Sequence, residues 1–250
     1  MDEQKISNIL IEHGESLFDA SKAFVKFTGD NEADTLLNDL KNHSHAFVLA
    51  CVMDRQVRAE IAWMIPFRFQ QKLGDFSIST LVSLSKDDIK ELMTKPEPLH
   101  RYPEKMSNNF YQAIKTIDSK YNRDVSKIWI DEPPSAKVVY QFLQFRGVGP
   151  KIATMATNIL ARDFKVKFSD YYSIDISADV HIRRVFTRLG LVQENASIEE
   201  IIYKARALYP DFPGLMDLPV WEIGRNWCKA KTPSCESCYM SDVCISSKIS

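Results

Sequence analysis

Two side chains and one group of thiols in the second half of the chain have the chemistry of an enzyme site. A lysine amine attacks electrophilic carbon when it is neutral, and a carboxylate stabilises positive charge or takes a proton. Lys151 and Asp179 supply these two groups. Four cysteine thiolates can bind a zinc ion or an iron–sulfur cluster, and the chain has them at Cys228, Cys235, Cys238 and Cys244.

The segment before Lys151 predicts a phosphate-binding turn. Gly147 and Gly149 alternate in residues 146–150, between an apolar segment and an apolar helix. Glycines allow a compact backbone whose N–H groups point outward at a helix N-terminus, and such a nest binds a phosphate. Taken alone, Lys151 is better explained as an exposed lysine that meets phosphate, and Asp179 as a simple helix N-cap.

Two motifs in the expected order change that interpretation. The run FRGVGPK (residues 145–151), followed by DVHIRRV (residues 179–185), resembles the helix-hairpin-helix (HhH-GPD) DNA glycosylases of the endonuclease III superfamily, with Phe145 in place of the usual Leu. The order C-x6-C-x2-C-x5-C near the end of the chain is similar to the iron–sulfur loop of that family. With its motifs, the resemblance covers about residues 37–250.

The resemblance implies a base excision repair enzyme that acts on double-stranded DNA containing a damaged or modified base. The base must be flipped out of the duplex before its glycosidic bond can be reached. Lys151 is then the nucleophile that forms a Schiff base and permits strand cleavage by β-elimination, and Asp179 stabilises the sugar cation. The implied activity is that of a DNA glycosylase and AP lyase. The implied DNA contacts are Gln56, Arg146, Gly147, Val148, Gly149, His181, Lys229 and Lys231.

The cysteine spacing favours a 4Fe-4S cluster over zinc. A zinc ribbon normally has two C-x2-C knuckles, whereas this chain has one, at Cys235 and Cys238. We expect the cluster to be structural, because the tail has too few apolar residues to fold unaided. The fifth cysteine, Cys51, lies in an apolar run and is expected to be a buried small hydrophobe.

Three features depart from the family pattern. Asp179 lies 28 positions after Lys151, because residues 163–177 form an enlarged loop. Tyr171 and Tyr172 in that loop either stack on a base or, more commonly for such tyrosines, pack. Gln56 matches a glutamine that fills the gap left by the flipped base, but its neighbours, Asp54, Arg55 and Arg58, are not the expected ones. The base that is excised therefore stays open.

Two other functions remain compatible with these motifs. One is a monofunctional glycosylase for alkylated, methylated or mismatched bases, against which the presence of Lys151 weighs. The other is a non-catalytic iron–sulfur DNA-binding protein, which would need neither Lys151 nor Asp179.

Composition excludes a disordered or a membrane protein. The chain is 45% hydrophobic and 26% charged, and no apolar run is long enough to span a bilayer. The N-terminus is acidic where a signal peptide is basic, so we expect a cytoplasmic, nucleoid-associated monomer. The formal net charge of −1 gives no global attraction to DNA, but residues 1–44 carry −5 and residues 141–193 carry +4. DNA binding should therefore depend on a local patch.

Apolar periodicity predicts helices almost throughout. We expect one helix from Ile6 to Val25, a buried one over residues 47–64 that stops before Pro66, and helices capped by Ser85 and Ser197. The fold class is therefore all-α. In the resembled family, two helical lobes flank a DNA cleft. Here these are a six-helix barrel over residues 37–164, which holds the hairpin motif, and an iron–sulfur lobe formed by residues 1–36 and 165–250.

Overall fold

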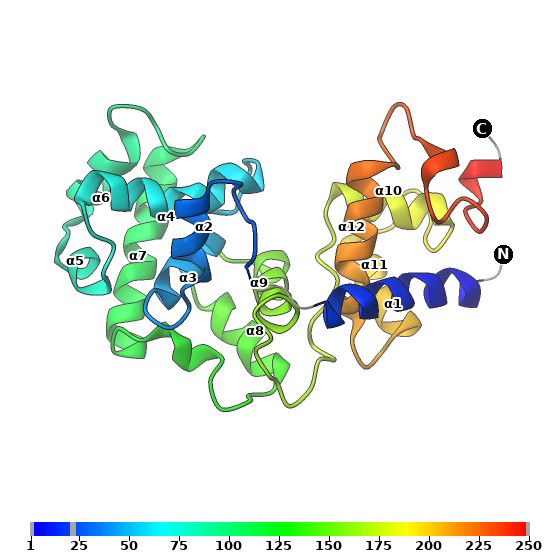
Figure 1. The fold of residues 1–250 in the computed structure, drawn as a ribbon, viewed down its shortest axis with the longest axis horizontal. Coiled ribbons are helices and arrows are strands. Elements are labelled where there is room, and N and C mark those ends of the chain that lie inside the picture. Colours follow the sequence, from blue (N-terminus) through cyan, green and yellow to red (C-terminus); the bar gives the residue numbers. More distant parts are fainter. Residues whose placement is uncertain (1–2, 21–23, 249–250) are drawn as a thin grey trace. The chain divides into compact units, whose positions relative to one another are not determined.

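The computed structural model describes residues 3–20 and 24–248, and these fold into helices with no β-strand among them (Figure 1). The all-α prediction is confirmed. Within the described residues, none of the helices combines the length and the apolar character that a membrane crossing requires. In chain order the α-helices are α1 (Glu3–Asp19), α2 (Asn31–Asn38), α3 (Ser44–Met53), α4 (Ala59–Leu73), α5 (Ile78–Ser83), α6 (Lys86–Thr94), α7 (Pro103–Tyr121), α8 (Ser135–Leu143), α9 (Pro150–Arg162), α10 (Val180–Leu189), α11 (Ile198–Leu208) and α12 (Asp217–Asn226).

Four short 3-10 helices complete the secondary structure of the described residues: η1 (Val125–Ile128), η2 (Pro213–Met216), η3 (Cys235–Ser237) and η4 (Ser246–Lys248). Both N-caps expected from the sequence are present, and each is part of a capping box. Ser85 caps α6 with Asp88 as its partner, and Ser197 caps α11 with Glu200.

The chain forms two compact units whose boundary differs from the expected one. The terminal unit comprises Met1–Ser21, Glu132–Val139 and Ala153–Ser250, and the central unit comprises Lys22–Asp131 and Tyr140–Ile152. Residues 24–36 therefore belong to the central unit rather than to the iron–sulfur lobe, because α2 packs on α3 and α4. Most of α9 belongs to the terminal unit, where the Asn158 side chain donates a hydrogen bond to the Gly214 carbonyl.

The central unit is built around α3. All ten residues of α3 are buried, and the helix packs against α2, α4, α7 and η1. Phe47 on α3 contacts the rings of Trp63, Trp129 and Phe142, at centroid distances of 5.7, 6.2 and 6.5 Å. A helix that is apolar on every side must be enclosed by its neighbours, which fixes the position of both its ends.

Two helix predictions in the first third of the chain are wrong. The expected helix over 47–64 is two helices, because the chain turns at residues 54–58, where Gln56 adopts a left-handed conformation with φ of 56°. Pro66 lies inside α4 instead of ending it. The helix expected to reach Val25 ends at Asp19, and Val25 is held instead by two hydrogen bonds with the Asn38 side chain, which accepts from its N–H and donates to its carbonyl oxygen.

The terminal unit has its own core, in which α10 packs on α12 and α1 packs on α12 and η2 (Figure 1). The most buried apolar side chains at its centre are Ile6, Leu10, Phe186, Ile201 and Met216. Partly buried cysteines and aromatic residues from the end of the chain pack against this core. The segment that carries the four expected metal ligands is therefore attached to α1 and α10 by apolar contacts.

The close packing of α1 on η2 gives a stability prediction. A Cβ atom on Gly14 would lie 2.5 Å from the Leu215 carbonyl oxygen and 2.9 Å from its Cγ. Gly14→Ala should therefore lower the free energy of unfolding by about 1–3 kcal/mol, although alanine is the better helix former by about 1 kcal/mol. Urea unfolding measures this. Ser16→Ala, at an exposed position of the same helix, is the control and should be neutral or stabilising. Unchanged stability in Gly14→Ala would contradict the packing described.

Candidate active site and cysteine cavity

The glycine turn between α8 and α9 is compact at one glycine and open at the other. Gly147 has a φ of 93°, and a Cβ atom there would lie 2.5 Å from Nδ2 of Asn109 and 3.1 Å from Nη1 of Arg55. Gly149 is different, because nothing lies within 4 Å of its Cβ position and its φ is not left-handed. The expectation that both glycines make the turn compact is therefore correct for Gly147 only.

The loop between α3 and α4 is bonded to this turn. Nη1 of Arg55 donates a hydrogen bond of 2.7 Å to the carbonyl oxygen of Gly147. On its other side, the Arg55 carbonyl oxygen accepts a hydrogen bond of 3.0 Å from Nε2 of His100. Gln56, the next residue, is exposed beside the turn. Arg55, which departs from the family pattern, thus holds together the two segments that the sequence assigned to DNA binding.

Lys151 is the second residue of α9 and is exposed, directly after the turn. Its charge acts on Asp54, the C-cap of α3, whose side chain also accepts a hydrogen bond from the indole of Trp63. Burial raises the pKa of the Asp54 carboxyl group, with Glu60 adding to the rise, while Lys151 and Trp63 oppose it. In the sequence, Asp54 stood out only as a residue that departs from the family pattern. An acid at the end of an otherwise apolar helix is the signal that could have found it.

Asp179 is the N-cap of α10 and is partly buried. Its Oδ1 accepts hydrogen bonds from the backbone N–H groups of His181 (2.7 Å) and Ile182 (2.9 Å). The simple capping role considered for this residue is therefore real, and both of these bonds use the same carboxylate oxygen. Lys151 belongs to the central unit and Asp179 to the terminal unit, so their meeting in one cleft stays a prediction.

His181 is held within the terminal unit by an arginine on its own helix. Nη2 of Arg184 lies 3.0 Å from Nδ1 of His181, and since a guanidinium only donates, Nδ1 accepts and the ring proton is on Nε2. The same arginine donates to the carbonyl oxygens of Gly224 (2.9 Å) and Cys228 (2.6 Å). Arg184 therefore connects the expected DNA contact on α10 to the beginning of the cysteine segment.

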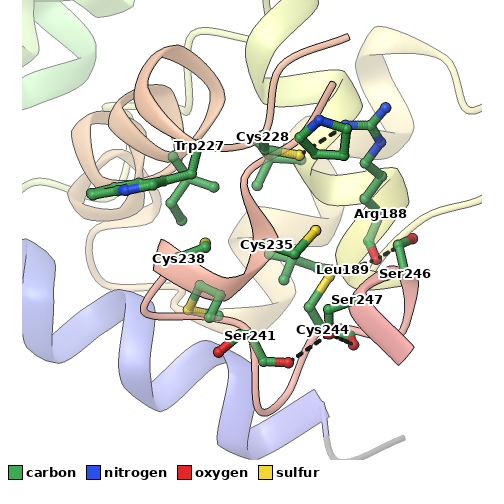
Figure 2. A pocket seen from close by; sticks show the side chains of 14 residues that line it. Arg188, Leu189, Trp227, Cys228, Cys235, Cys238, Ser241, Cys244, Ser246 and Ser247 are labelled. Carbon is green, nitrogen blue, oxygen red and sulfur yellow. Dashed lines mark hydrogen bonds between the residues drawn. The ribbon is translucent and has the colours of Figure 1, made fainter. Parts of the chain in front are cut away.

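The four cysteines of the C-terminal segment line one cavity of about 180 Å³ (Figure 2). Arg188 borders the same cavity, and its Nη1 lies 3.3 Å from Sγ of Cys228. The thiol of Cys244 donates to the Arg188 carbonyl oxygen at 3.3 Å. Cys51 is buried in α3 of the central unit, as expected, and has no part in the cavity. The cavity lining also includes Leu189, Ile223, Trp227 and Met240.

The cavity residues fit a thiolate-bound metal group in their chemistry. Burial raises the pKa of the Cys238 thiol, and the other three cysteines raise it further, because four thiolates repel one another unless a cation lies between them. As the side chains stand, no group of three or more His, Cys, Asp or Glu residues in residues 3–20 and 24–248 is arranged to hold a metal ion. The cluster therefore stays a prediction.

Four other residues were singled out in the sequence as possible DNA contacts, and their positions in the structure exclude neither DNA binding nor a purely structural role except for Tyr171. Lys229 and Lys231 are exposed in the loop between the first two cysteines, and Arg188 donates to the Lys229 carbonyl oxygen at 2.8 Å. Tyr171 packs against Phe212 at a centroid distance of 4.9 Å, so the packing explanation is correct for it, whereas Tyr172 is 55% exposed.

The enlarged loop, residues 163–177, is fixed by polar contacts inside the terminal unit. Asp170 accepts a hydrogen bond from Ser135 at the start of α8, and the Ser135 hydroxyl accepts one from the Ser173 N–H at 3.1 Å. Asp175 forms a two-pronged ion pair with Arg206, with N–O distances of 2.7 and 2.8 Å. The loop is therefore a built part of the unit that carries Asp179.

Comparisons with known proteins give two sequence relatives. Endonuclease III of Sulfolobus acidocaldarius is 27% identical over 135 residues, which cover 50% of this chain and 55% of that protein. Endonuclease III of Thermotoga maritima is 27% identical over 104 residues, covering 42% and 44%. The matched stretches thus span about half the length of these relatives. No protein-family model matches the chain.

Solved structures match over nearly the whole chain. A trapped endonuclease III–DNA covalent intermediate covers 100% of this chain and 99% of its own, with a TM-score of 0.66 and 18% identity. A thermostable thymine-DNA glycosylase covers 98% of both chains, with a TM-score of 0.65 and 14% identity. Identities this low establish the fold alone.

The geometry of the turn predicts that its two glycines respond differently to substitution. Gly147→Ala should lower the free energy of unfolding by about 1–3 kcal/mol, because a left-handed residue with a side chain is strained and Asn109 must move. Gly149→Ser is the matched control, since its side chain enters open space at the start of a helix, where serine is a favourable cap. Chemical denaturation compares the two. Equal losses of stability would show that the turn is not built as described.

Proposed function

We propose that this chain is a member of the helix-hairpin-helix DNA glycosylase superfamily that removes a damaged or modified base from double-stranded DNA and then cleaves the strand. The observation that carries the proposal is the position of Lys151, at the start of α9 and directly after a glycine turn whose outer side is open at Gly149. The endonuclease III-like fold supports base excision repair as the process.

The first chemical step needs a group that stabilises positive charge on the sugar. The target base leaves the stack, the glycosidic bond to C1′ breaks, and the electron pair departs with the base. Asp179 is the proposed stabiliser. Its capping bonds hold Oδ1 on the N-terminus of α10, so the carboxylate is fixed in direction and can meet the developing cation without reorganising.

The second step needs a neutral amine. The Nζ atom of Lys151 forms a bond to C1′, which gives an iminium ion once the sugar ring has opened. This ion makes the neighbouring C2′ proton acidic, and its removal expels the 3′ phosphate by β-elimination. Lys151 lies at the N-terminus of α9, directly after the glycine turn.

DNA binding is assigned to exposed groups around the turn and on the cysteine segment. The backbone N–H groups of Gly147 and Gly149 would bind a phosphate, whereas that of Val148 already donates to the Phe145 carbonyl oxygen at 3.0 Å. Arg146 and Gln56 are exposed on the same central unit, and Lys229 and Lys231 on the terminal unit. Contacts to the backbone position the enzyme, and Gln56 would fill the space of the extruded base. We place the enzyme, as a monomer, on the DNA of the cytoplasmic nucleoid.

The four cysteines are proposed to hold a 4Fe-4S cluster in the cavity of the terminal unit. When bound, such a cluster would cross-link the end of the chain to Cys228, which follows α12, and no step of the reaction depends on it. Arg188 would offset the negative charge of the thiolates, because it borders the cavity and its guanidinium group contacts Sγ of Cys228.

The cluster proposal predicts the metal content of the purified protein. Iron and acid-labile sulfide should be present in near-equal amounts, with brown colour, because a cubane cluster contains both in equal number. Cys238→Ala should lose iron and solubility, whereas Cys51→Ala should keep its iron, because Cys51 lies in the core of the other unit. Metal analysis together with a sulfide assay measures iron and sulfide in the wild type and in both variants. Zinc without sulfide would exclude the cluster.

The lyase proposal predicts a covalent adduct that depends on Lys151. Borohydride should trap the wild-type protein on a duplex with an abasic site, because it reduces the imine between an amine and the opened sugar. Lys151→Gln should abolish trapping and leave DNA affinity nearly unchanged. Gel electrophoresis of the protein–DNA adduct measures trapping, and a binding titration measures the DNA affinity.

The matched control is Lys41→Gln, which removes an exposed lysine elsewhere on the central unit and should trap normally. Release of a base without a trappable adduct would make the protein a monofunctional glycosylase, with Lys151 a phosphate contact. A panel of duplexes, each with one modified base, identifies the substrate when base release and nicking are assayed separately.

The role of Asp179 can be separated from its structural role, because asparagine is an equally good N-cap. Asp179→Asn should therefore fold normally but slow base removal by about 10²-fold or more, since an amide does not stabilise the sugar cation as a carboxylate does. Cleavage of a preformed abasic site should slow much less. Single-turnover kinetics on both substrates measures the difference, and equal slowing of the two steps would contradict the assignment.

A further inference from the structure

A carboxyl group next to Lys151 has no part in the reaction described above. Asp54 ends α3, where its backbone N–H donates to the Cys51 carbonyl oxygen at 3.1 Å. The following residue, Arg55, is bonded to Gly147, four positions before Lys151. The end of α3 and the start of α9 are therefore held together inside the central unit, where the charge of Lys151 acts on the Asp54 carboxyl group.

The surroundings of Asp54 are unusual for a structural acid. The side chain is partly buried at the end of a fully buried helix, and the indole N–H of Trp63 donates a hydrogen bond to it. Acidic side chains are seldom buried without a paired cation or a function. The nearby positive group is Lys151, which is also the proposed nucleophile.

We propose that Asp54 is the proton acceptor for Lys151, a positioning residue that takes the ammonium proton and leaves the amine able to attack. This inference rests on the proposed function of Lys151. On an abasic site, the proton passes from Nζ to an Asp54 oxygen, and the Nζ lone pair adds to the C1′ aldehyde. The acid then returns its proton to the C1′ hydroxyl group, which leaves as water. Ammonium and aldehyde thus become iminium and water, and Asp54 ends as a carboxylate.

The charges that face Asp54 support proton exchange with an amine. They are Lys151 from α9 and Glu60 from α4, while Cys51 on α3 faces it as a neutral thiol whose pKa is raised by burial and by Asp54. Burial raises the pKa of Asp54 and so brings it closer to that of an amine, which makes the carboxylate a better proton acceptor than a solvated one.

A carboxylate that served only as an ion-pair partner would have the opposite effect. It would hold the Lys151 side chain in an ion pair through its negative charge, so that its removal would free the amine and speed imine formation at neutral pH. The two roles therefore predict changes of opposite sign for one substitution, which makes the inference testable.

The experiment is borohydride trapping of full-length Asp54→Asn on a duplex with a preformed abasic site, across a pH series that spans neutrality. Asparagine still accepts the hydrogen bond from Trp63, so the loop should keep its structure. We expect trapping at neutral pH to slow by about 10²-fold or more, with the deficit shrinking as the pH rises and solvent takes the proton. Asp54→Glu should restore part of the rate. Asp118→Asn, which removes a carboxylate from an exposed ion pair on α7, is the matched control and should trap like wild type.

Trapping by Asp54→Asn that is unchanged or faster overturns the inference and leaves Asp54 as an ion-pair partner. If Asp54→Asn fails to fold, Asp54→Glu and Asp54→Ser decide, because a folded glutamate variant that traps no faster than Asp54→Ser also overturns the inference. Wild-type protein that gives no adduct at all overturns the proposed lyase function instead. The two failures are thus distinguished by the behaviour of the wild type.

Discussion

The hydrogen bond from Arg55 to the Gly147 carbonyl is the contact on which the candidate site depends. It joins a loop of five residues between α3 and α4 to the glycine turn, and the backbone at Gly147 leaves no room for a Cβ atom between Asn109 and this guanidinium group. Arg55 follows the fully buried helix α3, so its bond to the Gly147 carbonyl holds the loop and the turn as one piece. Gln56, Lys151 and Asp54 all take their positions from this connection.

Most of the fold could be predicted from local signals, because helix caps act within a few residues. Both expected N-caps formed, Ser85 on α6 and Ser197 on α11. The break at residues 54–58 could not be predicted, since apolar residues continue on both sides of it. Periodicity cannot show where a buried apolar run turns, and Pro66 was a misleading signal because α4 tolerates it in its interior.

Some residues of the candidate site could be predicted from the sequence and others could not, because contacts between segments far apart in the chain leave no local signal. The motifs placed Lys151 after a glycine turn and Asp179 at the start of α10, and both residues are there. Asp54 was found only in the structure, because it acts on Lys151 across 97 positions of sequence. Arg184 and Arg188 were likewise missed as supports of the cysteine segment, although their spacing of one helical turn places both on the face of α10 that meets it.

The most direct test of the account is to locate the covalent bond itself. Wild-type protein would be trapped with borohydride on a duplex with an abasic site, digested with a nuclease and a protease, and sequenced by mass spectrometry. The account predicts a reduced deoxyribose remnant on one peptide, attached to Nζ of Lys151 at the start of α9. A remnant on any other lysine or on the N-terminal amine would contradict it.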